Sequence, residues 1–453
     1  MKKFARSAFC SLLSLILIVS VLQISTLTVK AEGEVENIFS DIKGNEWFVP
    51  YVQFVYDTGI MSGKGNVFDP AGNMQREEIA QIIYNLAGKP QLHANPVNPF
   101  TDVKSSDWFY KSIIWCSANG IVGGIGNGKF GTGQKITRED FALMFFKFAQ
   151  ARNLDSVNNI DNTAIEGYAD TAKISPYAKT AMNWAISNGL ISGKGAAGAP
   201  KSEIKLDPKG YTTRAEGATI IKHFFAINIQ KWDTIRFGRY EQDNNIDNGK
   251  EAIEWEVLRV DGNKALLVSK YVLERKRINE TYSDVTWETC SLRKWLNEDF
   301  INTAFTGAEQ KRIPTVTLVN DNNPKKGTSG GNKTKDKLFL LSIDDIMECY
   351  GYQSFDLDNI YGFNQRLICA PTPYAKNAGI EEYVITEEDY NDYKQYGYTE
   401  DIIGMIGCSW WTRTPGENSR SNLFINPLGY TGEWYSVHDA GPGIRPVLYF
   451  EFK

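Results

Sequence analysis

The chain has 453 residues, of which 42% are hydrophobic and 23% are charged, with 39 glycines and 16 prolines. This composition excludes a disordered chain, a collagen-like chain and a small disulfide-stabilised scaffold, and the length predicts about three domains. The formal net charge of −5 argues against nucleic acid as a partner, because phosphate binding needs a basic face.

The first thirty residues have the pattern of a secretory signal peptide. Lys2, Lys3 and Arg6 precede an apolar run at residues 8–22, and a cleavage site with small residues ends at Ala31. A membrane anchor is the alternative, but the run is short and broken by serine. We therefore predict that residues 1–31 are removed, which would bring the net charge to −9. No later stretch is long and apolar enough to span a membrane.

Three segments of the first half repeat one pattern. An aromatic-x-Asp triplet precedes a further aromatic residue, and a glycine-rich turn begins twelve residues after that aromatic residue in every copy. Chance does not readily produce one spacing three times. The aromatic residues and the first turn glycines are Trp47 and Gly59, Trp108 and Gly120, and Tyr177 and Gly189.

Each copy predicts a helix, a glycine-rich loop and a second helix. Apolar residues recur at spacings of three and four before the glycine, and the glycine stands where a left-handed C-cap is needed. Thr213 and Glu216 fit the T-x-x-E capping box at the start of the third copy's second helix. Thr137 and Asp140 are a near match, whereas Gln75 is a poor cap and predicts a looser start.

These residues resemble the S-layer homology family. The family signature includes the Asp…Trp-Phe/Tyr opening, the Gly-Ile-x-x-Gly turn and the Thr-Arg-Ala-Glu box, and the match covers about residues 38–227. The resemblance implies an all-α pseudo-threefold bundle of three helix-loop-helix repeats. It also implies grooves between repeats that bind a secondary cell-wall polysaccharide, often ending in a pyruvylated amino sugar. Such binding would anchor an exported protein non-covalently to the peptidoglycan-bound polysaccharide of a bacterial wall.

The chemistry of the repeats is consistent with that implied ligand. A pyruvyl ketal is a carboxylate, and each second helix has an arginine in its first turn, where free N–H groups and the helix dipole favour an anion. The aromatic residues can pack on sugar faces, and the turn glycines let a sugar approach the backbone. The candidate binding residues are Arg76, Arg138, Arg214, Lys64, Lys194, Trp47, Trp108, Tyr177, Gly63 and Gly193.

Two alternatives stay open at this point, and the copies are not equivalent. The arginines can instead form surface ion pairs with neighbouring glutamates, and the tryptophans can belong to the core. Ile125 replaces the lysine of the second repeat, Tyr177 replaces tryptophan in the third, and Gln75 replaces threonine in the first. We therefore expect unequal grooves and favour a site that uses Arg76 or Arg214, whose repeats retain the lysine.

Three short motif matches are discounted. Residues 126–131 and 193–198 match a dinucleotide fingerprint, but both follow a helix rather than a strand. Residues 327–331 match a nucleophile elbow, but their surroundings are polar and rich in turns. Residues 243–254 echo a calcium loop whose glycine comes one position late, so a hairpin turn is the simpler interpretation.

Histidine and cysteine usage predicts no metal site and no cofactor. There are three histidines, and no pair of cysteines has the CxxC spacing of a zinc site. Five cysteines remain after removal of Cys10, so at least one thiol is free, and four of them lie after residue 280 and could pair. The five are Cys116, Cys290, Cys349, Cys369 and Cys408.

The second half changes to an α+β pattern. Residues 253–258 and 265–269 predict two strands joined at a turn around residues 261–263, and a helix is expected at about residues 292–300. Several segments resemble an uncharacterised family of bacterial extracellular domains. The motifs Trp-Trp-x-Arg-x-Pro-Gly at residues 410–416 and Gly-Ile-Arg-Pro at residues 443–446 also resemble, more distantly, formylglycine-generating enzymes and their C-type lectin-like fold.

The lectin-like resemblance implies a binding module without a recognisable active site. The paired active-site cysteines of the enzymes have no clear match, and calcium-lectin motifs are missing. The candidate contacts are Trp410, Trp411, Arg413 and Arg445, although the two arginines can instead tie the fold together through buried hydrogen bonds.

Together these patterns predict a multidomain, secreted protein of the cell surface. A signal peptide at residues 1–31 is followed by repeats at residues 38–92, 99–152 and 167–227, and by an α+β, C-type lectin-like domain at residues 232–453. The expected function is wall anchoring with display of a module that binds an unknown glycan or protein. The alternatives are a surface enzyme with chemistry near Cys408, His438 and Arg413, and a structural S-layer component.

Overall fold

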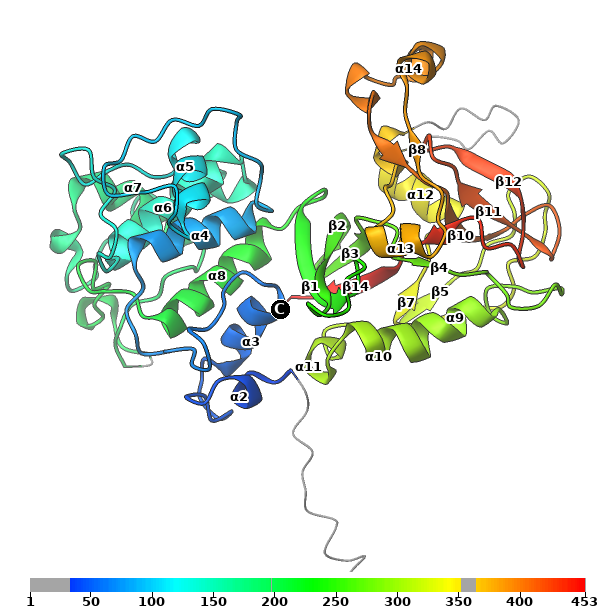
Figure 1. Ribbon diagram of the computed structural model, residues 1–453. Coiled ribbons are helices and arrows are strands. Elements are labelled where there is room, and N and C mark those ends of the chain that lie inside the picture. Colours follow the sequence, from blue (N-terminus) through cyan, green and yellow to red (C-terminus); the bar gives the residue numbers. More distant parts are fainter. Residues whose placement is uncertain (1–32, 197, 352–363, 453) are drawn as a thin grey trace, which may run out of the picture.

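The computed structural model describes residues 33–196, 198–351 and 364–452, so the predicted signal peptide lies outside the described residues. The molecule is multidomain, with helices in its N-terminal part and sheets in its C-terminal part (Figure 1). In the part of the chain that the structure describes, no helix has both the length and the apolar character needed to cross a membrane.

The helix-loop-helix prediction is confirmed in all three repeats. The first helices are α3 (Val49–Asp57), α5 (Tyr110–Ala118) and α7 (Lys179–Ser187), and the second helices are α4 (Arg76–Leu86), α6 (Arg138–Ala151) and α8 (Arg214–Asn228). A short helix α2 (Val35–Ile38) precedes them, and single turns of 3₁₀ helix are η1 (Asp155–Asn158), η2 (Thr171–Lys173), η3 (Pro176–Ala178) and η4 (Lys201–Glu203).

The helix ends follow the predicted capping chemistry. Gly59, Gly120 and Gly189 have φ values of +64°, +69° and +65°, so each first helix ends in a left-handed glycine. Thr213 accepts a hydrogen bond from the N–H of Glu216, whose carboxylate accepts from the N–H of Thr213. The sequence predicts a looser start for α4 because Gln75 is a poor cap. In the structure the N–H of Gln75 donates to the carboxylate of Glu78 at 2.8 Å, and α4 begins at the position equivalent to the starts of α6 and α8.

The three repeats close into a ring at the segments that precede their second helices. The N–H of Met74 donates to the carbonyl of Thr212 at 2.9 Å, the N–H of Thr212 donates to Ile136 at 3.1 Å, and the N–H of Ile136 donates to Met74 at 2.9 Å. Each first helix also packs against a second helix of another repeat, in the pairs α4–α5, α6–α7 and α8–α3. No repeat is therefore a complete unit by itself.

The invariant aspartate of the repeat pattern is structural. Asp41 accepts the N–H groups of Phe68 and Asp69 at 2.9 and 2.7 Å, and Asp170 accepts those of Leu206 and Asp207. Asp102 does the same in the second repeat. Burial raises the pKa of Asp102, but hydrogen bonds from three backbone N–H groups outweigh that effect and lower the pKa.

The C-terminal domain contains two five-stranded sheets. The first sheet has the order β1-β2-β3-β14-β7 and is antiparallel throughout. Its strands are β1 (Thr234–Tyr240), β2 (Glu251–Asp261), β3 (Lys264–Ser269), β14 (Val447–Glu451) and β7 (Leu338–Phe339). The strands predicted at residues 253–258 and 265–269 are confirmed as β2 and β3.

The second sheet has the order β12-β11-β10-β13-β4, with β10 and β13 parallel. Its strands are β12 (Thr431–Ser436), β11 (Ser421–Ile425), β10 (Trp410–Pro415), β13 (Gly443–Ile444) and β4 (Glu274–Arg275). Two small sheets pair β5 (Val316–Leu318) with β6 (Thr334–Asp336) and β8 (Tyr383–Val384) with β9 (Ile406–Gly407).

Short helices cover these sheets. The predicted helix is present as α9 (Ser291–Trp295), a π-helical turn η5 (Leu296–Phe300) and α10 (Ile301–Ala304). Asn297 lies in that turn and bonds to the backbone of Leu338 through both its amide nitrogen and its amide oxygen. The other helices are α11 (Gly307–Gln310), α12 (Ile343–Tyr350), η6 (Gln365–Leu367), α13 (Pro373–Asn377), α14 (Glu387–Tyr393), η7 (Lys394–Tyr396) and η8 (Glu400–Ile402).

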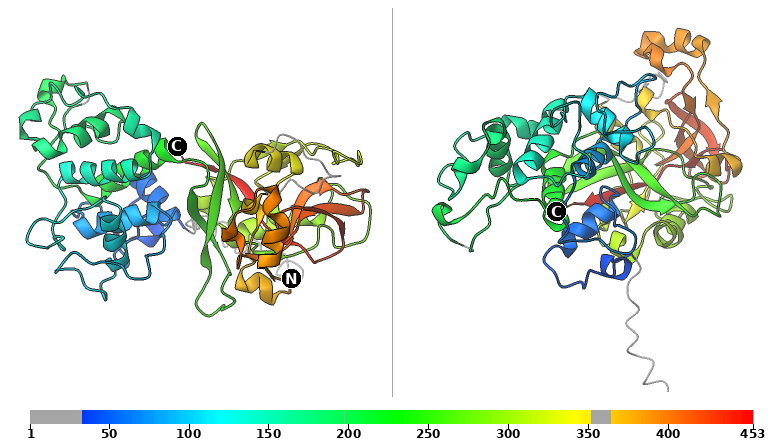
Figure 2. Two further views of the ribbon diagram at one scale, coloured as in Figure 1. Left: turned by 90° about the horizontal axis from the view of Figure 1, so that it is seen from above. Right: turned by 60° about the vertical axis from the view of Figure 1, so that its left-hand side comes forward.

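The two parts of the molecule pack against one another through aromatic residues. The ring centroids of Phe54 and Phe450 lie 6.2 Å apart, and those of Phe225 and Phe452 lie 5.9 Å apart. The chain therefore ends at the boundary between the helices and the sheets, where Figure 1 and the left view of Figure 2 place the C-terminus.

A buried ion pair crosses the same boundary. Asp57, at the end of α3, has a side chain that is 2% exposed, and it accepts hydrogen bonds from Arg312 Nε at 3.2 Å and Gln53 Nε2 at 2.6 Å. The Arg312 guanidinium also lies 5.3 Å from the ring centroid of Phe54. Burial raises the pKa of Asp57 to about 7, although Arg312 and Gln53 oppose that rise.

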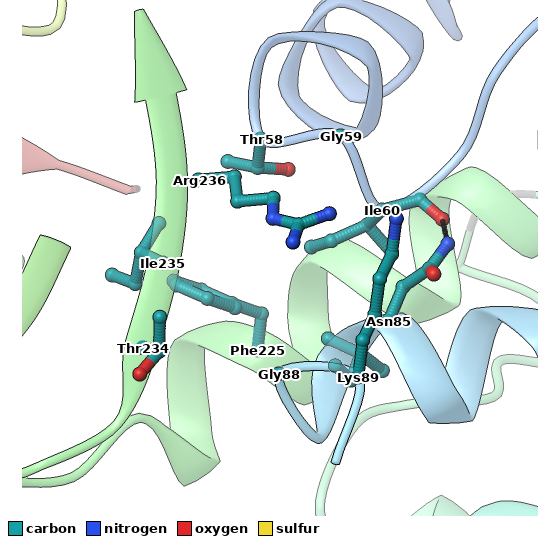
Figure 3. A pocket seen from close by; sticks show the side chains of 11 residues that line it. Thr58, Gly59, Ile60, Asn85, Gly88, Lys89, Phe225, Thr234, Ile235 and Arg236 are labelled. Carbon is teal, nitrogen blue, oxygen red and sulfur yellow. Dashed lines mark hydrogen bonds between the residues drawn. The ribbon is translucent and has the colours of Figure 1, made fainter. Parts of the chain in front are cut away.

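A small pocket next to this contact is lined from both parts (Figure 3). Lys89 from the first repeat and Arg236 from β1 both face it, and Arg236 is held by the carboxylate of Glu254 at 2.6 Å. Burial lowers the pKa of Lys89, and the positive charge of Arg236 lowers it further. The boundary thus combines an apolar contact with charges that are partly removed from water.

The raised pKa of Asp57 predicts a pH-dependent stability. The protonated carboxyl is favoured in the packed state, so this stabilisation is complete below the ordinary pKa of 3.8 and is lost as the pH rises through about 7. We expect the melting temperature of the unmodified protein, measured by circular dichroism, to fall between pH 5 and pH 7.5 relative to that of Asp57→Asn. Asp247→Asn, in an exposed loop, is the control and should keep the unmodified profile. Parallel profiles for the unmodified protein and Asp57→Asn would contradict the prediction.

Candidate functional site

The signature arginines lie between repeats rather than within one. Arg214, from the third repeat, reaches the turn of the first repeat, where its Nε donates to the carbonyl of Phe68 at 2.7 Å and its Nη2 donates to that of Ser62 at 2.5 Å. We call this place the Arg214 junction. The arginine thus closes the contact between the first and last repeats.

The other two arginines repeat this geometry in cyclic order. Arg138, from the second repeat, donates to the carbonyls of Leu206 and Ser192 in the third repeat at 3.0 and 2.8 Å. Arg76, from the first repeat, donates to Phe130 and Gly123 in the second, at 3.2 Å in both cases. These places are the Arg138 junction and the Arg76 junction, and the hydrogen bonds are longest at the latter.

Lysine and carboxylate groups complete the Arg214 junction. Arg214 Nη1 lies 3.0 Å from Glu78, and Lys64 Nζ lies 3.8 Å from the same carboxylate and 3.1 Å from Asp69. The lysine side chain is 46% exposed, whereas Arg214 is 4% exposed. The junction therefore holds a buried guanidinium and a lysine that can still meet a ligand.

The Arg138 junction has the same set of charges. Lys194 Nζ lies 3.3 Å from Glu216 and 3.0 Å from Asp207, and Arg138 Nη1 lies 3.7 Å from Glu216. Each lysine therefore shares a carboxylate with the arginine of another repeat. We had grouped Arg76 and Arg214 with the lysines of their own repeats, but the structure brings Lys64 to Arg214 and Lys194 to Arg138.

The Arg76 junction is different. Ile125 stands in place of the lysine, and Arg76 forms no ion pair with any residue that the structure describes. Asp140 is held instead by Thr137 Oγ1 at 2.8 Å and by the hydroxyl of Tyr177 at 3.0 Å. Burial lowers the pKa of Arg76, which the negative charge of Asp140 partly offsets. The guanidinium therefore stays half-buried and free of a carboxylate.

The repeat aromatic residues are on the surface. Trp47 is 61% exposed, Trp108 is 64% exposed and Tyr177 is 58% exposed. These values exclude the core interpretation that the sequence left open for the two tryptophans. Trp47 and Trp108 pack edge-on against the neighbouring Phe48 and Phe109 and leave more than half of their surface open to solvent.

The turn glycines Gly63 and Gly193 have a packing role. A Cβ at Gly63 would lie 2.2 Å from the ring of Phe39, and one at Gly193 would lie 2.0 Å from the side chain of Ile204. Both positions therefore need glycine because an apolar side chain packs under the turn.

The candidate residues of the C-terminal domain belong to its core. Trp410 and Trp411 are fully buried, and their indole N–H groups donate to the carbonyls of Leu367 and Lys276. Arg413 is 6% exposed and bonds to the carbonyl of Leu340 and to Asp345. Arg445 is 2% exposed and bonds to the carbonyl of Ser269 and to Glu256. All four side chains therefore belong to the core. For Arg413 and Arg445 this agrees with the alternative that they tie the fold together through buried hydrogen bonds.

The cysteines are free and buried, which bears on the enzyme alternative. Burial raises the pKa of Cys116, Cys290, Cys349, Cys369 and Cys408, so none is poised as a thiolate. Cys408 Sγ lies 3.2 Å from the carbonyl oxygen of Cys369. Among the described residues, no hydrogen bond joins His438 to Cys408.

The segment that echoes a calcium loop is the connection of the β1–β2 hairpin, with Gly249 at φ +85°. Carboxylate oxygens of Glu241, Asp243 and Glu251 lie within 4.8 Å of one another. Backbone N–H groups already donate to all three carboxylates, because Glu251 accepts from Gln242, and Glu241 and Asp243 both accept from Asn245. The carboxylates therefore stabilise the hairpin connection.

Sequence reasoning missed the acidic members of the junctions. The sequence predicts Glu216 only as part of a capping box and does not single out Glu78, but each carboxylate lies near an arginine and a lysine. Asp69 and Asp207 carried no signal in the repeat pattern, because Asp69 follows Lys64 by 5 residues whereas Asp207 follows Lys194 by 13 residues. Aligning the three copies on the residue after Phe68, Phe130 and Leu206 would have found Asp69 and Asp207, because the copy with Ile125 has Gly131 there.

Comparison with known proteins identifies both parts of the chain. The model of the S-layer homology domain matches residues 38–80, 99–142 and 167–216, and the model of a domain of unknown function, DUF6273, matches residues 262–451.

Curated relatives are similar over part of the chain. A surface-layer 125 kDa protein of Lysinibacillus sphaericus is 27% identical over 57% of this chain and 18% of its own. A cellulosome-anchoring protein of Acetivibrio thermocellus is 33% identical over 19% of this chain and 20% of its own. An endoglucanase of Bacillus sp. is 29% identical over 40% of this chain and 18% of its own. The chain thus spans about a fifth of the length of these relatives. It carries three S-layer homology domains followed by a DUF6273 domain, which is the domain organisation of a secreted cell-surface protein.

Proposed function

We propose that residues 38–227 anchor the protein non-covalently to a secondary cell-wall polysaccharide and thereby hold the C-terminal domain at the cell surface. The observation that carries this proposal is the set of three junctions, each with a guanidinium fixed between repeats and aromatic rings exposed on the same bundle. Fixed positive charge and open ring faces suit an acidic sugar. The names of the relatives, a surface-layer protein and a cellulosome-anchoring protein, point the same way.

The junctions should not contribute equally to binding. At the Arg138 and Arg214 junctions a ligand carboxylate must compete with Glu216 or Glu78 for a guanidinium that is already 4% exposed. At the Arg76 junction no carboxylate pairs with the guanidinium, and the exposed side chain of Ile125 adds an apolar surface. A pyruvyl ketal presents a carboxylate beside a methyl group, so we infer that the Arg76 junction binds this group most tightly.

The finer architecture is part of the proposal. We infer a pseudo-threefold bundle with repeats at residues 38–92, 99–152 and 167–227, which the closed cycle of hydrogen bonds among Met74, Ile136 and Thr212 supports. We infer a C-type lectin-like binding role for residues 232–453. Because Trp410, Trp411, Arg413 and Arg445 are buried, its ligand must meet other side chains.

Wall binding can be tested directly. The mature chain should sediment with purified bacterial walls that carry a pyruvylated polysaccharide, and it should stay in solution once acid has stripped that polysaccharide. The soluble saccharide should compete, and it should compete less well after removal of the pyruvyl ketal, because the carboxylate is then lost. Undiminished sedimentation with stripped walls would show that the polysaccharide is not the receptor.

The binding role of Arg76 and the structural role of Arg138 can be distinguished by measuring both wall binding and stability. Arg76→Ala should weaken wall binding about tenfold or more, since a charge-assisted contact contributes about 1.5 to 3 kcal/mol, and should lower the free energy of unfolding less than Arg138→Ala does, because Arg76 has longer hydrogen bonds and no ion pair in the described structure. Arg138→Ala should lower the free energy of unfolding by about 2 to 4 kcal/mol, because two carbonyls lose their donor and Glu216 loses one of its two cationic partners. Lys173→Ala, an exposed cation away from the junctions, is the control. Equal loss of wall binding by Arg76→Ala and the control would refute the inferred role of this junction.

The exposed tryptophans give an independent test. Trp47→Ala combined with Trp108→Ala should reduce wall binding while leaving the thermal unfolding transition nearly unchanged, since both rings are more than half exposed. Tyr282→Ala, which removes a 63% exposed aromatic side chain from the C-terminal domain, is the matched control. Unchanged binding by the double variant in isothermal calorimetry with the soluble saccharide would exclude stacking on these rings.

A further inference from the structure

An arm formed by residues 380–407 projects from the C-terminal domain. It contains β8, α14 and β9, and Figure 1 and the right view of Figure 2 show α14 at its far end, away from both sheets and from the repeats. Ile385, Tyr398 and Ile402 form a small core of their own with Ile368, separate from the main core. The arm is therefore a folded projection with its own packing.

The arm holds most of the net negative charge of the predicted mature chain. It contains eight acidic residues and one lysine, a net charge of −7, whereas the chain without residues 1–31 carries −9. Among the described residues only one acid of the arm, Glu382, is in an ion pair, and its partner Lys376 lies outside the arm. Like charges at this density repel one another and gain from a cationic partner.

Apolar side chains are exposed on the same arm. Of the fifteen large hydrophobic side chains that are exposed in the described structure, five lie here. Val384 and Ile406 are 53% and 40% exposed, and they face one another across the β8–β9 ladder, so they share one face of the hairpin. The others are Tyr383, Ile403 and Met405.

The sheet itself can accept another strand. β8 and β9 pair only with each other in the described structure, so each has an outer edge whose backbone groups have no strand partner. An extended peptide that adds to such an edge alternates its side chains between the two faces of the sheet. One set of those side chains would reach Val384 and Ile406, and the arm's carboxylates would be available to basic residues.

We propose that the arm is a docking site for a basic polypeptide segment in which lysine or arginine alternates with apolar residues. The sign of the charge rejects nucleic acid and an anionic membrane surface, and the exposed apolar face distinguishes this surface from one that only holds counterions. The docking would be independent of the wall-binding repeats, because no arm residue belongs to a junction.

The test uses the mature chain and two labelled decapeptides in fluorescence anisotropy at low salt. In one peptide lysine alternates with valine, and in the other lysine alternates with serine. We expect the lysine–valine peptide to bind at least tenfold more tightly than the lysine–serine peptide. We also expect its affinity to fall as salt is raised, because the exposed charges are screened.

Matched variants assign the binding to the arm. In the first variant, Glu381, Glu387, Glu388 and Glu400 become Gln and Asp392 becomes Asn, and binding should fall at least tenfold. The control changes five exposed acids elsewhere, with Glu166, Glu203, Glu280 and Glu417 becoming Gln and Asp247 becoming Asn, and should bind like the unmodified chain. A third variant, Val384→Thr with Ile406→Thr, should lose the preference for valine over serine while keeping the melting temperature.

Three outcomes would overturn the proposal. Equal loss of binding in the arm variant and the control would show that overall charge is responsible. Equal affinity for the two peptides would show that no apolar contact is made. Salt-sensitive dimerisation of the unmodified chain in analytical ultracentrifugation, abolished in the arm variant, would assign the arm to a second copy of the chain instead.

Discussion

The N-terminal half depends on groups that cross from one repeat to the next. A guanidinium that donates to two backbone carbonyls of another repeat satisfies acceptors that would otherwise be left unpaired at a turn. Because the three arginines are placed in cyclic order, loss of one repeat would expose such carbonyls and leave an arginine without its partners. The bundle is therefore a single cooperative unit, although its sequence consists of three copies.

The same constraint explains why the junctions can differ in function. Arg138 and Arg214 are nearly buried and paired with carboxylates, so they serve the structure first. At the Arg76 junction Asp140 is held by Thr137 and Tyr177, and Arg76 has longer hydrogen bonds and no ion pair in the described structure. A copy that departs from the repeat pattern thus has the guanidinium that is most available to an anion.

The sequence predicted the helices and strands that depend on local residue patterns. Helices α3 to α8 follow from apolar periodicity, left-handed glycines and threonine caps, and strands β2 and β3 follow from two apolar runs beside a turn. It could not predict which lysine meets which arginine, because that depends on the order in which the repeats close. It also could not show that Trp410 and Trp411 are buried whereas Trp47 and Trp108 are exposed, since composition and spacing do not separate a core ring from a surface ring.

The boundary between the two parts determines how the C-terminal domain is presented. Phe54 and Phe225 of the repeats pack against Phe450 and Phe452 at the end of the chain, so the last strand of one domain is buried by the helices of the other. Asp57 adds a charge that is desolvated only when this contact is formed. A protein attached to a wall by its repeats would therefore hold its C-terminal domain in a fixed orientation rather than on a flexible linker. The same contact fixes the position of the acidic arm relative to the repeats.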